Sequence, residues 1–160
     1  MQEIERKFII KNLKNIDELD FVYSERYFLF NEDGIEIRIT QKENKYIFER
    51  KEKISDLTRN WLKFEISERE FNELKKISSQ RIIRKNYYID KNTSIKVYEW
   101  DFIWLIRLEK EFENEIDAQK FDPSEYSKFG DIWNEITVSQ LGKDSQLVKL
   151  TKKIFIELLS

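Results

Sequence analysis

Acidic and basic side chains recur at every second position along several short stretches of this sequence. Near the start, Glu3, Glu5 and Lys7 follow this spacing, and Glu109 and Glu111 repeat it later in the chain. Residues two apart lie on the same face of a β-strand, so each stretch would present one charged face. Clustered carboxylates can bind a hard divalent cation such as Mg²⁺ or Mn²⁺, and clustered ammonium and guanidinium groups can bind a phosphate.

The residue types that are missing narrow the chemistry further. The chain contains no cysteine and no histidine. This excludes a disulfide framework, a thiol nucleophile and Ser-His-Asp catalysis, and it leaves carboxylates as the metal ligands. Lys and Arg number 29 against 31 Asp and Glu, a net charge of -2. We therefore expect no general attraction to nucleic acid or to an anionic membrane, and an anion site would have to be a local concentration of bases.

The elements that must position these side chains are mainly strands. Alternating patterns predict strands over residues 2–10, 24–30, 34–41, 44–51, 59–66, 81–90, 94–102 and 104–112. Helical patterns are fewer. "SEREFNELKKI" begins at Ser67 with Glu70 completing a capping box, "IDAQKF" reads as a short helix, and "DSQLVKLTKKIFIELL" begins at Asp144 as a possible cap.

This order of elements predicts one mainly β (α+β) domain over residues 1–160. About eight antiparallel strands with few helices form either a sandwich or a closed barrel. No signal-peptide pattern opens the chain, and no apolar run is long enough to span a bilayer. The expected location is cytoplasmic, without a membrane partner.

One face of each predicted strand collects charged or amide side chains. These sets are Glu3, Glu5, Lys7; Glu36, Arg38; Glu49, Lys51; Lys63, Glu65; Arg84, Asn86; Glu99, Asp101; and Arg107, Glu109, Glu111. The ordinary interpretation is a solvated outer face. However, three strands place two acids on the same face, where like charges gain nothing from each other. A barrel with these charges inside becomes reasonable if it holds divalent cations and a polyanion.

The order of the motifs resembles that of a known family. "EIERK" at residues 3–7 resembles the ExExK signature of the CYTH superfamily, the triphosphate tunnel metalloenzymes, which include inorganic triphosphatases, thiamine triphosphatases and class IV adenylate cyclases. "GIEIRI", "YIFERK", "KFEISEREFNEL", "RIIRKNYYI", "YEWDF", "LEKEF" and "NEIT" resemble the later motifs of that family, in the same order. The resemblance implies a closed tunnel of eight antiparallel strands, lined by charged residues, with a few peripheral helices and a C-terminal helix.

The resemblance also implies roles for particular residues. The metal-binding carboxylates would be Glu3, Glu5, Glu65, Asp101, Glu109 and Glu111, holding Mg²⁺ or Mn²⁺. The bases that bind the phosphate chain would be Lys7, Arg38, Lys51, Arg84 and Lys143, with Lys7 and Lys51 acting in catalysis. The implied function is metal-dependent hydrolysis of a triphosphate-containing small molecule, either inorganic triphosphate or a nucleoside or thiamine triphosphate. A binding module without catalysis and an adenylate cyclase are the alternatives.

Three positions depart from the family pattern. Lys63 stands where the family usually has Glu, Thr40 where a second Arg often follows Arg38, and Asn86 where an Arg is usual. An ammonium at position 63 would repel a cation, and the other two changes remove positive charge. Reduced activity or a changed substrate is therefore expected.

Overall fold

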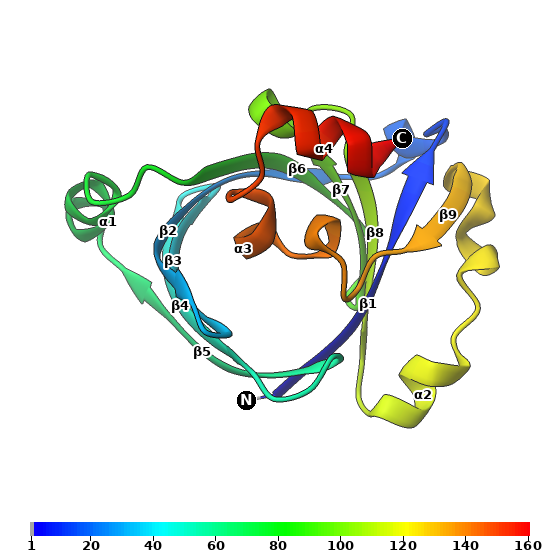
Figure 1. Ribbon diagram of the computed structural model, residues 1–160, viewed down its shortest axis with the longest axis horizontal. Coiled ribbons are helices and arrows are strands. Elements are labelled where there is room, and N and C mark those ends of the chain that lie inside the picture. Colours follow the sequence, from blue (N-terminus) through cyan, green and yellow to red (C-terminus); the bar gives the residue numbers. More distant parts are fainter. Residues whose placement is uncertain (1) are drawn as a thin grey trace.

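The computed structural model describes residues 2–160, and its main feature is a closed barrel of eight antiparallel strands (Figure 1). The strands are β1 (Gln2–Lys11), β2 (Phe21–Glu32), β3 (Ile35–Lys42), β4 (Lys45–Lys53), β5 (Thr58–Ile66), β6 (Arg81–Asp90), β7 (Thr93–Tyr98) and β8 (Ile106–Phe112). They follow the order β1-β5-β4-β3-β2-β6-β7-β8, and β8 pairs again with β1. The mainly β barrel that the sequence predicts is thus confirmed, and a sandwich is excluded.

Strand β1 closes the barrel along one of its edges and binds an additional strand on the same edge. Its first residues pair with β5 through Gln2–Asn60, Glu3–Arg59 and Ile4–Thr58. Its last residues pair with β9 (Asp131–Glu135), through Phe8, Ile10 and Lys11. The sequence patterns did not indicate β9, a short strand that lies outside the barrel.

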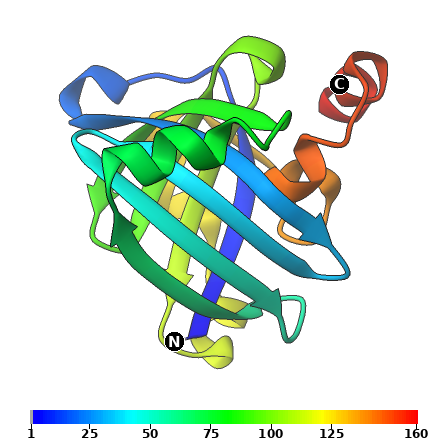
Figure 2. The same cartoon turned by 90° about the vertical axis from the view of Figure 1, so that its left-hand side faces the viewer.

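Helices cover the outside and one end of the barrel. The remaining elements are η1 (Ile16–Glu18), α1 (Glu68–Lys75), η2 (Trp100–Phe102), α2 (Glu115–Lys120), η3 (Pro123–Phe129), η4 (Gln140–Gly142), α3 (Asp144–Leu147) and α4 (Lys152–Leu159). Helix α1 begins with the expected capping box of Ser67 and Glu70 and lies on the outer wall (Figure 2), where Phe71 packs against Tyr27 and Tyr46. None of the helices within residues 2–160 is long and apolar enough to cross a membrane.

The apolar core lies outside the strands, because the barrel interior is polar. One cluster places Phe8, Ile95 and Leu108 of the wall against Tyr126 and Phe129 of η3. A second cluster lies at one end of the barrel, where Leu141, Leu147 and Phe155 pack against residues that include Ile9, Phe28 and Ile82. Burial of these side chains, about 25 cal/mol per Å² of apolar surface, is the main stabilising contribution, and it leaves the inward-facing positions free for charged groups.

The C-terminal segment differs most from the sequence prediction. One helix was expected from residue 144 onward, but α3 ends at Leu147 and α4 begins only after Thr151, whose side chain accepts the cap hydrogen bond from the Ile154 N–H. In Figure 1, which looks along the barrel, η4 and α3 lie within the outline of the strands. We call this segment the floor of the barrel, because it lies at one end and its residue Asp144 lines the cavity.

Candidate functional site in the barrel interior

The barrel encloses a cavity of about 190 Å³ whose walls are dominated by charged side chains. Among residues 2–160, eleven basic side chains line it: Lys7, Arg26, Arg38, Lys42, Lys51, Arg59, Lys63, Arg84, Lys91, Lys96 and Arg107. Six acidic side chains accompany them: Glu3, Glu5, Glu49, Glu109, Glu111 and Asp144. The interior is therefore strongly positive within a chain whose net charge is -2, as expected for a site that binds a polyanion.

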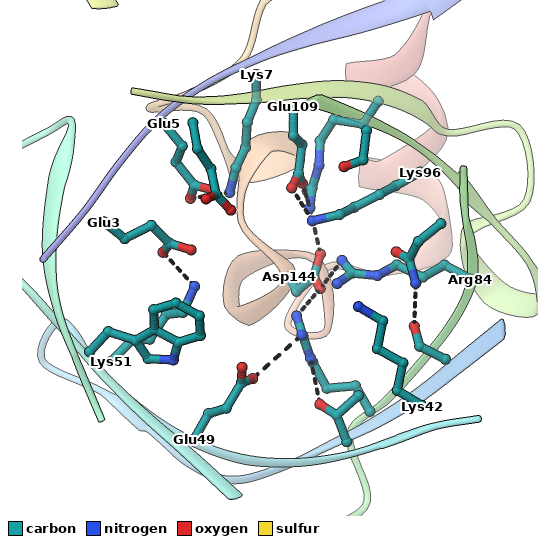
Figure 3. A pocket seen from close by; sticks show the side chains of 18 of the residues that line it. Glu3, Glu5, Lys7, Lys42, Glu49, Lys51, Arg84, Lys96, Glu109 and Asp144 are labelled. Atoms are coloured by element: carbon teal, nitrogen blue, oxygen red, sulfur yellow. Dashed lines mark hydrogen bonds and ion pairs between the residues drawn. The ribbon is translucent and has the colours of Figure 1, made fainter. Parts of the chain in front are cut away.

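Strands β1 and β8 form the acidic wall. Their register places Glu5 opposite Glu111 and Lys7 opposite Glu109. The carboxylates are nevertheless bound by bases, since Lys7 Nζ lies 2.7 Å from Glu5 Oε1 and Lys51 Nζ lies 2.5 Å from Glu3 Oε2 (Figure 3). Acids and bases are thus interleaved in the cavity.

Lys96 and Glu109 form a buried pair on the neighbouring strands β7 and β8. Glu109 contacts Lys96 and Arg107. Burial alone would raise the pKa of Glu109, but these two bases outweigh it and hold the pKa well below its usual range. Burial and the nearby Arg84 lower the pKa of Lys96 to about 7, although Glu109 opposes them. Lys96 is therefore partly deprotonated near neutral pH.

The floor of the cavity centres on Asp144. Its carboxylate oxygens lie 2.7 Å from Arg26 Nη1, 2.6 Å from Arg84 Nη1 and 3.0 Å from Arg107 Nη2. Tyr98 donates a further hydrogen bond of 2.5 Å to Asp144 Oδ1. Figure 3 shows Asp144 in the middle of the ring of side chains. Although four donors converge on this carboxylate, the Nε atoms of Arg84 and Arg107 are buried and have no hydrogen-bond partner within residues 2–160.

Strands β3 and β4 supply a further set of paired charges. Arg38 donates hydrogen bonds of 3.0 Å to Glu36 and 2.8 Å to Glu49. Burial, together with the charges of Arg38 and Arg84, lowers the pKa of Arg26 to about 10. This crowding of guanidinium groups favours the binding of an anion, which would relieve their repulsion.

Carboxylates that could hold a metal ion lie near the mouth. Burial, followed by the charges of Glu3 and Glu5, raises the pKa of Glu111, so a cation beside these three carboxylates would relieve their mutual repulsion. Their oxygens suit Mg²⁺ or Mn²⁺. Within the part of the chain that the structure describes, no three acidic side chains form a group that could hold a metal ion. Lys7 binds Glu5, and Lys51 binds Glu3. The donors fit a divalent cation in kind, and a cation would have to replace these two ammonium groups.

Most of the residues singled out in the sequence line this cavity. Glu3, Glu5, Glu109 and Glu111 do so, as do Lys7, Arg38, Lys51 and Arg84. The three residues that depart from the family pattern also line the cavity. Lys63 and Asn86 lie in its wall, and the Thr40 hydroxyl accepts a hydrogen bond from Arg26 Nε.

Three predicted site residues lie elsewhere, which corrects the prediction. Asp101 is exposed in η2, because β7 ends at Tyr98 and its even-numbered residues, Ser94 and Lys96, face the cavity. Glu65 lies beyond the end of the cavity and is 67% exposed in an ion pair with Lys45. Lys143 does not line the cavity but a second hollow, which shares Lys51 and Arg59 with it.

Six charged residues of the cavity belong to none of the charged sets in the sequence and were not predicted as site residues: Arg26, Lys42, Arg59, Lys91, Lys96 and Asp144. Arg26, Arg59 and Lys96 line the cavity, but the residues two positions away from each in the sequence are uncharged, so no repeated pattern marked them. Asp144 was expected to cap a helix, but Lys143 occupies the N-cap position and no side chain caps α3. The role of Asp144 as the partner of three arginines is seen only in the structure, because its position depends on how the C-terminal segment folds.

The barrel is similar to several solved structures. Inorganic triphosphatase NE1496 superimposes with a TM-score of 0.65 at 24% identity, covering 93% of this chain and 95% of that chain. Protein PH1012 from Pyrococcus horikoshii OT3 gives 0.57 at 16% identity, covering 74% and 84%. A protein from Bacillus halodurans, described as a proposed adenylate cyclase, gives 0.54 at 15% identity, covering 73% and 83%.

Comparison of the sequence with protein-family models and with curated proteins gave no match. At identities below 25%, the structural likenesses establish the fold but not the activity. The chain thus shares its fold with an inorganic triphosphatase, and this agrees with the CYTH-type fold that its motifs suggest.

Proposed function

We propose that the protein is a metal-dependent phosphohydrolase that acts on a triphosphate-containing small molecule inside the barrel. The observation that carries this proposal is the charge of the cavity, where eleven bases face six acids. Two buried guanidinium Nε donors within residues 2–160 also lack a partner. An extended polyanion would satisfy such donors and neutralise the excess charge.

Lys7, Arg38, Lys51 and Arg84 are the residues that would bind the phosphate chain. All four are buried. Lys7, Arg38 and Lys51 are held by carboxylates that a phosphate oxygen can replace, as Glu5 holds Lys7, whereas Arg84 is held by Asp144 of the floor. Positive groups placed around the chain stabilise the negative charge that moves to the leaving diphosphate during hydrolysis. Lys7 and Lys51, which contact Glu5 and Glu3 of the acidic wall, are proposed to supply this charge in catalysis.

Glu3, Glu5 and Glu111, with Glu109 beside them, are the residues proposed to bind Mg²⁺ or Mn²⁺. When bound, the ion would polarise a phosphoryl oxygen and lower the pKa of a coordinated water. The nucleophile would be water, since the chain has no cysteine or histidine.

The proposal is tested by incubating the protein with tripolyphosphate, ATP or thiamine triphosphate, each with Mg²⁺ or Mn²⁺, and identifying the products. Release of phosphate from at least one substrate, with loss of activity in Lys7→Met and Lys51→Met, is expected. Formation of cyclic AMP from ATP would instead identify a cyclase. Absence of turnover for all three substrates with both metals would overturn the proposal.

Metal binding has its own test. In calorimetry without substrate, Glu5→Gln and Glu111→Gln should abolish Mn²⁺ binding, because each removes an anionic ligand. Glu65→Gln is the matched control, since Glu65 is exposed outside the cavity, and it should bind Mn²⁺ as the wild type does. Equal affinities in all four proteins would contradict this assignment.

A binding module without catalysis is the second candidate. It is favoured by Lys63 and Asn86 in the cavity lining and by the pairing of Glu3 and Glu5 with lysines, which competes with metal. Tight binding of tripolyphosphate in calorimetry, together with unchanged substrate in the product assay, would identify this function.

A further inference from the structure

Asp144 is unusual because a carboxylate from the C-terminal segment occupies the position where an anion would be expected. Arg26, Arg84 and Arg107 come from three different strands of the wall and converge on it, and Tyr98 adds a hydroxyl. The carboxylate is 2% exposed. Three guanidinium groups and a hydroxyl around one anion form the kind of arrangement that binds a phosphate group through charge-assisted hydrogen bonds.

We propose that Asp144 is a built-in anion that fills the innermost anion position of the cavity and thereby fixes how many phosphates of a chain the site can bind. This inference rests on the proposed function, because it assigns specificity for phosphate-chain length to the same cavity. While Asp144 is in place, the phosphate nearest the floor binds above it. Without Asp144, the three guanidinium groups become available, and the chain can extend inward by one phosphate.

The geometry of the two ends supports this role. At the floor, α3 is held by several contacts besides those of Asp144: Ser145 Oγ bonds to Glu36 at 2.5 Å, and Asn31 Nδ2 bonds to the Ser145 carbonyl at 2.6 Å. At the mouth, Lys42, Lys63 and Lys91 line the cavity and extend the positive surface outward. A longer chain can therefore project from the mouth, so the limit set by Asp144 concerns the number of phosphates held inside.

The first test replaces the built-in anion with a free one. Asp144→Ala leaves three buried guanidinium groups without their carboxylate, so its melting temperature in chloride should fall. Inorganic phosphate should restore it by roughly 5 °C or more relative to an equal ionic strength of chloride. The same phosphate should shift the wild type and Glu65→Ala much less. If the variant does not fold in chloride, it should refold in phosphate.

The second test measures affinity by calorimetry for tripolyphosphate and tetrapolyphosphate. The ratio of the affinity for tetrapolyphosphate to the affinity for tripolyphosphate should be about tenfold larger in Asp144→Ala than in the wild type. A factor of this size corresponds to one hydrogen bond to a charged group. Glu49→Ala is the matched control, because Glu49 is a buried carboxylate beside Arg26 and Arg38 that does not form the floor. It should strengthen binding of both ligands alike.

The outcomes separate this inference from the proposed function. Equal stabilisation of wild type and Asp144→Ala by phosphate, or a preference for tetrapolyphosphate no greater than in Glu49→Ala, would overturn the role of Asp144. If Asp144→Ala does not fold even in phosphate, Asp144→Asn decides the point. A preference for tetrapolyphosphate in Asp144→Asn that equals that of the wild type would also overturn the role of Asp144. If the wild type binds no polyphosphate, the proposed function fails. The melting temperature of Asp144→Ala in phosphate would still show whether an anion binds in place of the Asp144 carboxylate.

Discussion

Single side chains of the cavity are held in charged states that depend on their partners. Glu5 and Glu49 are buried, and bases around them outweigh burial and lower their pKa values. Lys96 behaves differently, since burial and other cations dominate over its contact with Glu109. Unlike these two carboxylates, Lys96 can therefore change its charge near neutral pH when a ligand binds.

We predict that tripolyphosphate binding at pH 8 is accompanied by proton uptake at Lys96. With a pKa of about 7, this amine is mostly neutral at pH 8. A bound polyanion favours the charged form and raises the pKa, so the amine gains a proton. Calorimetry in buffers of different ionisation enthalpy measures this uptake. Lys96→Met should show less uptake, and equal values for both proteins would count against the assignment.

A second prediction concerns Lys63 at the mouth. Its Nζ lies 5.0 Å from the centre of the Trp61 ring, and both residues line the cavity. Lys63→Glu removes an ammonium that repels cations and adds a carboxylate, so Mn²⁺ affinity and tripolyphosphate hydrolysis at limiting Mn²⁺ should rise. Initial rates across a Mn²⁺ titration separate affinity from turnover. Lys45→Glu, exposed outside the cavity, should change neither; weaker metal binding in Lys63→Glu would refute the idea.

At the scale of elements, alternation along the strands predicted the inward residues wherever a strand stays regular. Glu3, Glu5 and Lys7 on β1 and Glu109 on β8 were found in this way. Prediction failed in β7, where Glu99 and Asp101 continue the outward face of Ile95 and Val97 beyond the strand end. It also failed in the floor, because an irregular segment has no period from which the direction of a side chain can be inferred.

The floor itself depends on the close packing of Gly142. A Cβ at this position would lie 1.7 Å from the carbonyl oxygen of Ile136, which is backbone and cannot move freely. Gly142→Ala should therefore displace η4 and lower the free energy of unfolding by about 1–3 kcal/mol or more. Gly34→Ala is the comparison, since its nearest atom would be 3.5 Å away, although its φ of +75° also disfavours alanine.

Urea unfolding of both glycine variants decides the point. The Gly142 variant should lose more stability, and it should also lose affinity for tripolyphosphate because η4 immediately precedes Asp144. The Gly34 variant changes a turn between β2 and β3 and costs about 1–2 kcal/mol, the penalty for a left-handed residue. A smaller loss for Gly142→Ala than for Gly34→Ala would mean that the floor adjusts to the added methyl group.

At the scale of the whole molecule, the usual distribution of side chains is inverted. The barrel wall carries its apolar residues outward, against η3 and the C-terminal helices. It encloses buried charged groups such as Glu5, Arg38 and Arg107. Buried ion pairs add little net stability, but removing one partner is costly. The stability of the barrel should therefore depend on conditions that keep both members of each pair charged.

We predict that this inversion makes the fold sensitive to acid. Five buried carboxylates, Glu5, Glu36, Glu49, Glu109 and Asp144, have pKa values lowered by neighbouring bases. In the unfolded chain they titrate near 4.5, or 3.8 for Asp. Their contribution is therefore complete above about pH 5, and it is lost as the pH falls, because the unfolded chain binds protons first. The raised pKa of Glu111 acts in the opposite sense, but it is one group against five.

Each such group removes about 1.4 kcal/mol per pH unit once the unfolded chain is protonated. Five groups acting together could remove a typical folding free energy of about 5–15 kcal/mol within two pH units. Urea unfolding from pH 7 to pH 3 should show a nearly constant free energy down to about pH 5 and a steep fall below it. Glu65→Gln, which alters an exposed carboxylate, should follow the same curve. A free energy that stays constant down to pH 3 would show that the interior carboxylates do not depend on their charge to stabilise the barrel.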